Sequence, residues 1–170
     1  MQVIWNPADK IHCFLNPSLG IATAISENFS DSASGKCFGD ILTVVVDEGG
    51  NFCDLEVRIN QEDMPSGIGR RVGCEVISAP FATEIRPSDQ MYCLLSMNDR
   101  QLEVKLNEET PLSWKSFSGG NVLLGLTNSA VLSRIIFWGA QEDADGTKEA
   151  AWLSEIRAKL TGGSHQNQGW

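Results

Sequence analysis

The amino-acid sequence predicts a mainly β fold: two pseudo-symmetric antiparallel sheet units followed by one C-terminal helix. Three observations support this prediction. The segment 7–15 (PADKIHCFL) recurs at 87–95 (PSDQMYCLL) with Pro, Asp, Cys and Leu in place. In both halves, apolar and polar residues alternate with a period of two, which is the spacing of strands with one face on a core. Only 147–160 (TKEAAWLSEIRAKL) carries apolar residues at helical spacing.

The internal repeat continues beyond the first matching segment. The segment 40–42 (DIL) is matched by 121–123 (NVL), and 52–57 (FCDLEV) is matched by 132–137 (LSRIIF). These offsets predict one loop that is a residue longer in the second copy and one turn that is a residue shorter. Each copy is therefore expected to contain the same strands in the same order.

The segment between the copies is rich in Gly and Pro, as linkers are, and no apolar run approaches the length of a membrane span. A single domain at 1–161 is expected, because the chain length suits one domain. Its predicted parts are repeat one at 1–62, a linker at 63–82, repeat two at 83–140 and a helix at 147–160, followed by a polar tail at 162–170 that is expected to be disordered.

The last strands of the two copies differ in the side chains that they turn away from the core. In copy one, Asp54 and Glu56 alternate with apolar residues, so the outer face is charged. In copy two, Ile136 and Trp138 stand at outward positions, and an apolar sheet face needs a cover. We therefore expect the C-terminal helix to pack on the second sheet unit, with Trp152 near Trp138.

Composition limits the classes of ligand and the compartment. The chain has a net charge of −9, which argues against direct nucleic-acid binding because phosphate contacts need clustered Lys and Arg. Its five cysteines are odd in number, without a C-x-x-C pair, and it has two histidines, so neither a disulfide framework nor a metal site is expected. The N-terminus lacks a basic segment followed by an apolar core, which predicts a cytoplasmic protein.

No catalytic or cofactor motif is present, and we expect neither a catalytic residue nor a cofactor. A G-x-S-x-G motif is absent, and His12 is replaced by Tyr92 in the second copy, as at a half-buried aromatic position. The Gly-rich segment 66–73 (SGIGRRVG) fits neither phosphate-loop spacing. Cys13 and Cys93 occupy equivalent inward positions, which favours a packing role.

The motif Pro-x-Asp-x-apolar-(His or Tyr)-x-x-Leu, followed by an Asp-x-x-Gly turn and Leu-Glu-Val, resembles a short β-rich bacterial domain family of unknown function. That resemblance implies a compact antiparallel sheet for each copy and no particular activity. Copy two keeps the first motif but has NSAV in place of the turn. The size, acidity and β-rich build also resemble the general style of immunity proteins that neutralise bacterial polymorphic toxins. The matching residues are Asp9, Ile11, Leu15, Asp47, Gly50, Leu55, Glu56 and Val57 in copy one and Asp89, Met91, Tyr92 and Leu95 in copy two.

The leading functional interpretation is a protein-binding module, in its most concrete form an immunity protein that occludes a basic toxin such as a nuclease. Charge would steer the encounter. Two alternatives remain: a small-ligand binder or enzyme with a pocket between the repeats, and a homo-oligomeric structural protein joined through strand edges. The residues expected to contact a basic partner are Asp47, Glu48, Asp54, Glu56, Glu62, Asp63, Asp143 and Asp145.

Overall fold

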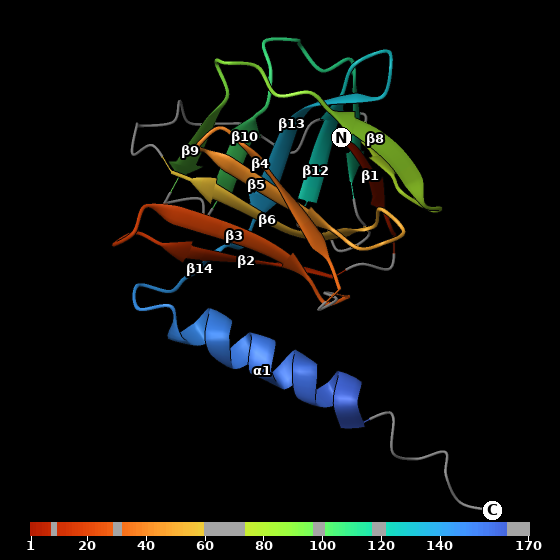
Figure 1. Cartoon of the computed structure of the whole chain (residues 1–170). Helices are drawn as coiled ribbons and strands as arrows, with labels where there is room; N and C mark the ends of the chain where they lie inside the picture. The colour runs from red at the N-terminus through yellow and green to blue at the C-terminus, as the bar shows by residue number, and fades with distance from the viewer. Residues whose placement is uncertain (8–9, 29–31, 60–73, 97–100, 117–121, 163–170) are drawn as a thin grey trace, which may run out of the picture.

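The computed structural model describes residues 1–7, 10–28, 32–59, 74–96, 101–116 and 122–162. The described chain is mainly β, with two sheets and one helix, α1 (Thr147–Gly162), as the sequence predicts (Figure 1). The first sheet has the order β14-β2-β3-β6-β5-β4. Its strands are β2 (Ile11–Asn16), β3 (Ile21–Ser26), β4 (Ser34–Phe38), β5 (Leu42–Val46), β6 (Phe52–Arg58) and β14 (Gln141–Glu142).

The second sheet repeats the arrangement of the first. Its main run is β9-β10-β13-β12-β11, and all neighbours in that run are antiparallel. This order is the same as β2-β3-β6-β5-β4, strand for strand, so the predicted pseudo-symmetric units are confirmed. The strands of the second sheet are β1 (Gln2–Trp5), β7 (Glu75–Val76), β8 (Phe81–Ile85), β9 (Tyr92–Ser96), β10 (Gln101–Lys105), β11 (Ser113–Ser116), β12 (Val122–Leu126) and β13 (Val131–Trp138).

The strand register corrects the predicted alignment of the copies. Leu42 pairs with Val57, and Val122 pairs with Phe137, so Leu42 corresponds to Val122 and not to the residue after it. The turn between β5 and β6 therefore has the same length as the turn between β12 and β13. A register shift falls at the equivalent place in both pairs, at the end of β5 and at the end of β12.

The first strands of the two copies, β1 and β8, link the two sheets: Ile4 on β1 forms an isolated parallel bridge with Asn51 beside the first sheet, and β8 pairs in parallel with β13 of the second. β1 pairs antiparallel with β8, and Val3 lies opposite Thr83. Val3 and Thr83 are as far apart in the sequence as the equivalent residues Cys13 and Cys93 of β2 and β9. They therefore occupy equivalent positions in the two copies. A pseudo-twofold axis therefore passes between them. β7 and β8 also show that the end of the predicted linker forms strands and is not only a connector.

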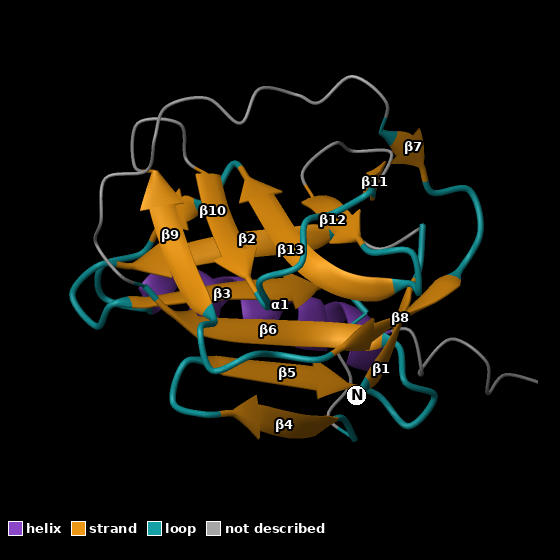
Figure 2. Cartoon of the chain, turned by 90° about the horizontal axis from the view of Figure 1, so that it is seen from above, coloured by secondary structure: helices purple, strands orange, loops and turns teal. Residues whose placement is uncertain are grey.

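One cluster of buried apolar side chains fills the space between the sheets. It includes Leu15 and Leu55 from the first sheet and Leu102 and Ile135 from the second. Figure 2 shows the strands of one sheet running across those of the other, as in an orthogonal sandwich. The two copies therefore share one core.

The predicted helix forms, but the expected packing partner is wrong. α1 lies on the outer face of the first sheet (Figures 1 and 2), where the Trp152 ring is 4.7 Å from the ring of His12 and 5.8 Å from that of Phe14. The reason is β14, which follows repeat two and pairs in parallel with β2 at the edge of the first sheet. The chain is thereby carried away from Trp138 before the helix begins.

The two equivalent hairpin turns share one geometry but not one sequence. The amide of Gly50 donates to the carbonyl of Asp47, and the amide of Ala130 donates to that of Thr127. Gly50 has a φ of 82° and Ala130 a φ of 56°, so the alanine occupies a left-handed conformation that glycine adopts without steric cost.

Ala130→Gly is therefore expected to stabilise the protein, by up to about 1 kcal/mol in the free energy of unfolding. Relief of the steric cost outweighs the entropy that glycine adds to the unfolded chain. Urea denaturation followed by tryptophan fluorescence measures the change. Gly50→Ala is the matched control and should change stability in the opposite direction; a destabilising Ala130→Gly would mean that the left-handed turn position carries no steric cost.

Candidate functional site

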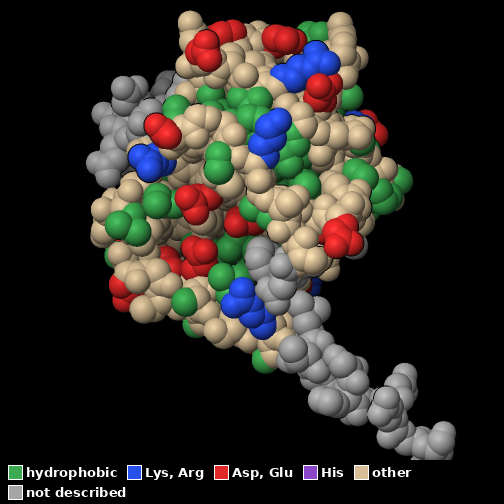
Figure 3. All heavy atoms as spheres, in the orientation of Figure 1, with side chains coloured by type: hydrophobic (Ala, Val, Ile, Leu, Met, Phe, Trp, Pro, Cys, Tyr) green, Lys and Arg blue, Asp and Glu red, His purple; other side chains and the backbone are tan. Residues whose placement is uncertain are grey.

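Three carboxylates from two elements gather on the outer face of the first sheet. Asp54 and Glu56 point outward from β6, because the alternate residues Leu55 and Val57 enter the core. Glu149 comes from the first turn of α1, which covers this face. Figure 3 shows acidic side chains over β3 and β6 above the N-terminal half of the helix. We call Asp54, Glu56 and Glu149 the acidic face.

Asp54 lies in an environment that disfavours an ionised carboxylate. Its side chain is partly buried, and its Oδ1 atom is buried with no hydrogen-bond partner in the described part of the chain. Burial raises the pKa of this carboxyl from 3.8 to about 7, and the nearby charges of Glu149 and, to a smaller extent, Glu56 act in the same direction. In the described part of the chain, no cation is among the groups that shift this pKa.

Glu149 is anchored from the sheet. The Thr23 hydroxyl on β3 donates to Glu149 Oε2 at 2.8 Å. Register places Thr23 opposite Glu56 on the neighbouring strand, so the contact holds the helix carboxylate beside the carboxylates of β6. Sequence patterns alone do not reveal Glu149 and Thr23 as site residues, because their proximity depends on which sheet the helix covers.

His12 lies on the outer face of the first sheet and does not enter the space between the repeats. Its Nε2 atom is 3.0 Å from Glu27 Oε1, and its ring contacts Trp152. A pocket between the repeats would therefore lack this histidine, and the shared core there is apolar. The side chain of Tyr92 lies outside the described residues.

The two equivalent cysteines are buried, as the sequence predicts. Cys13 is 7% exposed and Cys93 is fully buried. Burial raises the pKa of the Cys13 thiol to about 12, and it raises the pKa of Cys93 as well. Both thiols are therefore protonated at neutral pH and unsuited to nucleophilic chemistry.

The structure contradicts the expected partner-binding role of Asp143. Its side chain is 2% exposed, and its two oxygens accept hydrogen bonds from the amides of Lys148 and Glu149, both at 2.9 Å. The carboxylate satisfies amides at the N-terminus of α1, where a negative charge is favourable. Asp145 is exposed and also caps the helix, since its Oδ1 accepts from the amide and the hydroxyl of Thr147.

The other predicted acids are placed elsewhere or lie outside the described residues. Asp47 closes the β5–β6 turn, where Oδ1 accepts from the Asn51 amide at 2.9 Å, and hydrogen bonds from Asn51 lower its pKa. Glu48 is exposed in the same turn. Glu62 and Asp63 lie outside the described residues.

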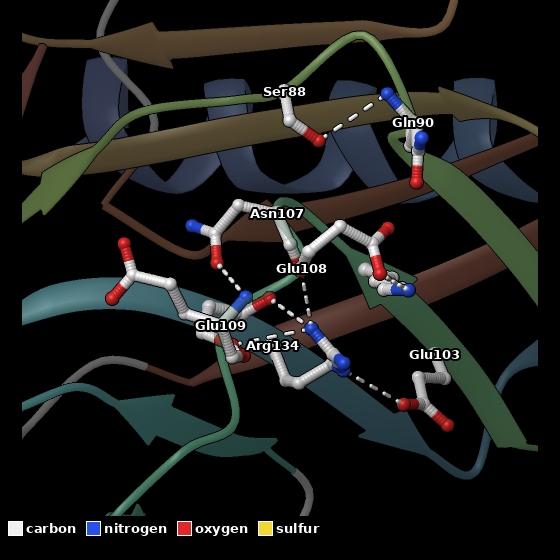
Figure 4. A network of polar contacts seen from close by, with 9 residues as sticks. Ser88, Gln90, Glu103, Asn107, Glu108, Glu109 and Arg134 are labelled. Carbon is white, nitrogen blue, oxygen red and sulfur yellow. Dashed lines mark hydrogen bonds and ion pairs between the residues drawn. The ribbon is translucent and has the colours of Figure 1, made fainter.

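The outer face of the second sheet is arranged differently. Arg134 takes the position of Asp54, and its Nε lies 3.6 Å from Glu103 Oε1 (Figure 4). Arg134 Nη1 also donates to the carbonyl of Asn107 at 2.7 Å. Because these opposite charges neutralise one another, they leave little net field at this position for a charged partner.

The connection between β10 and β11 partly covers this second face. Pro111 and Trp114 pack over Gly125, where a Cβ atom would lie only 2.9–3.0 Å from their side chains. The equivalent residue in copy one is Val45. The two outer faces have therefore diverged: one is partly covered by a loop, and the other is partly covered by α1 and carries the acidic face, where Glu56 is exposed.

The described residues contain no group of three or more His, Cys, Asp or Glu side chains that could hold a metal ion. Within the same residues, no helix is long and apolar enough to cross a membrane. A scan against models of known protein families finds no match for this chain, and neither does a search of curated proteins. The resemblance to the short β-rich bacterial domain family stays a prediction.

Proposed function

We propose that this protein is a cytoplasmic protein-binding module that uses the acidic face to bind a basic partner. Its most concrete form is an immunity protein that occludes a basic bacterial toxin such as a nuclease. The observation that carries the proposal is the grouping of Asp54, Glu56 and Glu149, whose charges raise the cost of ionising Asp54. A cationic side chain placed against this face would relieve that cost.

The net charge of −9 supports the same proposal at longer range. A strongly negative protein attracts a basic partner before contact and speeds the encounter, and salt weakens this attraction. The contact set is Asp54, Glu56 and Glu149, with Glu48 and Asp145 as more distant exposed acids. Asp143 is left out because its carboxylate is buried against the helix amides.

The test is a binding measurement between the purified protein and the product of the gene immediately upstream. We expect a complex that weakens as salt is raised, and rescue of growth when both proteins are expressed together. Glu56→Gln with Glu149→Gln should weaken binding at low salt on the order of tenfold, because two charges are lost from the contact.

The matched control is Asp40→Asn with Glu84→Gln, which removes the same number of charges at positions outside the acidic face. It should alter affinity much less than the first pair. Equal losses from both pairs would assign the effect to net charge alone. Absence of any complex, together with no rescue of growth, would reject the immunity proposal.

A further inference from the structure

The outer edge of β11 in the second copy is occupied by a short parallel strand. β7 pairs with it in the register Lys115 opposite Glu75 and Ser116 opposite Val76. The amide of Ile77 then donates to the carbonyl of Ser116 at 2.9 Å. The edge of this sheet thus holds an extended segment by main-chain hydrogen bonds, which is the geometry of strand addition.

Two side chains add specificity to this docked segment. Glu75 Oε2 lies 2.8 Å from Lys115 Nζ, and Ile77, two residues later, is 5% exposed and joins the shared core. Val76 between them points outward and is 56% exposed. The edge of β11 therefore binds a segment in which a glutamate is followed, two positions later, by an aliphatic residue that packs at the edge of the core.

In the first copy, the equivalent edge strand is β4, and it carries a lysine at the position of Lys115. Lys36 pairs with Val44 on β5, and Lys115 pairs with Leu124 on β12, at equivalent positions of the two copies. Lys36 therefore corresponds to Lys115. Each lysine Nζ also lies 5.3 Å from the centroid of an aromatic ring, that of Phe38 or that of Phe81. The two edges share both backbone register and side-chain chemistry.

In the described part of the chain, β4 pairs only with β5, and Figure 2 shows β4 at the outer edge of its sheet. Ser34 to Cys37 are exposed. Cys37 corresponds to Ser116, whose carbonyl receives the docked strand, so the backbone groups of Cys37 face outward. A lysine on an edge strand commonly discourages unwanted pairing. Lys115, the counterpart of Lys36 on β11, instead forms an ion pair with Glu75 of the added strand β7.

We propose that the outer edge of β4 binds an extended segment of a partner protein in parallel. A glutamate of that segment would lie opposite Lys36, and an aliphatic residue two positions later would pack at the edge of the core. The occupied edge of β11, and not the acidic face, supports this site, which goes beyond the function proposed above.

The probe is a peptide with the sequence of residues 72–80 in which the cysteine is replaced by serine (VGSEVISAP). It is titrated into the isotopically labelled full chain, and amide chemical shifts are followed by NMR. We expect shifts at residues 34–38 that weaken with added salt. Lys36→Glu should lower the affinity roughly tenfold, because it replaces an attraction by a repulsion. The charge-reversed peptide VGSKVISAP should then bind the Lys36→Glu protein better than the original peptide does.

A second variant tests the backbone contribution. Cys37→Pro removes an amide that faces outward and takes no part in pairing with β5, so the sheet is retained while peptide binding is lost. Shifts confined to residues 113–116 would reveal exchange at the occupied edge and overturn the proposal. It would equally be overturned by no shift at millimolar peptide, by affinity unchanged in Lys36→Glu, or by shifts that follow self-association measured by light scattering.

Discussion

Asp54→Asn is expected to stabilise the protein at pH 8 and to flatten its stability between about pH 4 and pH 7. Asp54 faces Glu149 on α1 and Glu56 on its own strand, while β3 and β5 place Ile25 and Val45 opposite it. An ionised carboxylate in this position is poorly solvated and close to like charges. Asparagine keeps the shape of the side chain and carries no charge.

The direction in which stability changes with pH follows from the direction of the pKa change. The pKa rises from 3.8 to about 7 on folding, so the folded state binds more protons than the unfolded state between these values. The contribution of Asp54 to stability is fully present below the lower value and is lost as pH rises through the upper one. At pH 8 the substitution should raise the free energy of unfolding by about 2–4 kcal/mol, the lower figure allowing for solvent around a partly exposed side chain.

Urea denaturation at a series of pH values measures this effect. Wild-type stability should fall across the window, and that of Asp54→Asn should stay nearly level there. Asp40→Asn, at an exposed position, is the matched control and should leave the pH profile unchanged. Parallel profiles for wild type and Asp54→Asn would show that the carboxyl ionises in the folded protein without cost.

The sequence predicted the fold because the repeat constrains it twice. The strands of the main antiparallel run in each copy have counterparts in the other copy, as Cys13 on β2 and Cys93 on β9 illustrate. Two agreeing patterns are harder to misinterpret than one. The outward direction of Asp54 and Glu56 followed from the same period of two. These are local features, so residue order alone carries them.

The position of the helix could not be predicted in this way. It depends on β14, a strand of only two residues that pairs with β2 far away in sequence. So short a strand has no detectable period. Because the helix was expected on the other sheet, the proximity of Glu149 to Asp54 could not be predicted. Asp143 was misinterpreted for a related reason, because a carboxylate that caps a helix looks in sequence like any acid in a loop.

Trp5→Ala is expected to cause a severe loss of stability. Trp5 is 1% exposed, and its ring stacks on Phe52 with centroids 4.7 Å apart. Its indole Nε1 donates to Thr83 Oγ1 at 2.9 Å, across the strand pair that contains the pseudo-twofold axis. Truncation to alanine should lower the free energy of unfolding by about 3–5 kcal/mol, because it opens a cavity and leaves the Thr83 hydroxyl without this donor.

Two further variants separate the contribution of ring packing from that of the hydrogen bond. Trp5→Phe keeps an aromatic ring against Phe52 but removes the donor, and should cost about 1–3 kcal/mol. Thr83→Val in the same protein removes the acceptor as well and should recover part of that loss, since no buried polar group is then left unmatched. Because the two copies share one core, every variant should unfold in a single transition. Two separate transitions, or a loss below about 1 kcal/mol for Trp5→Ala, would mean that β1 and β8 do not hold the copies together.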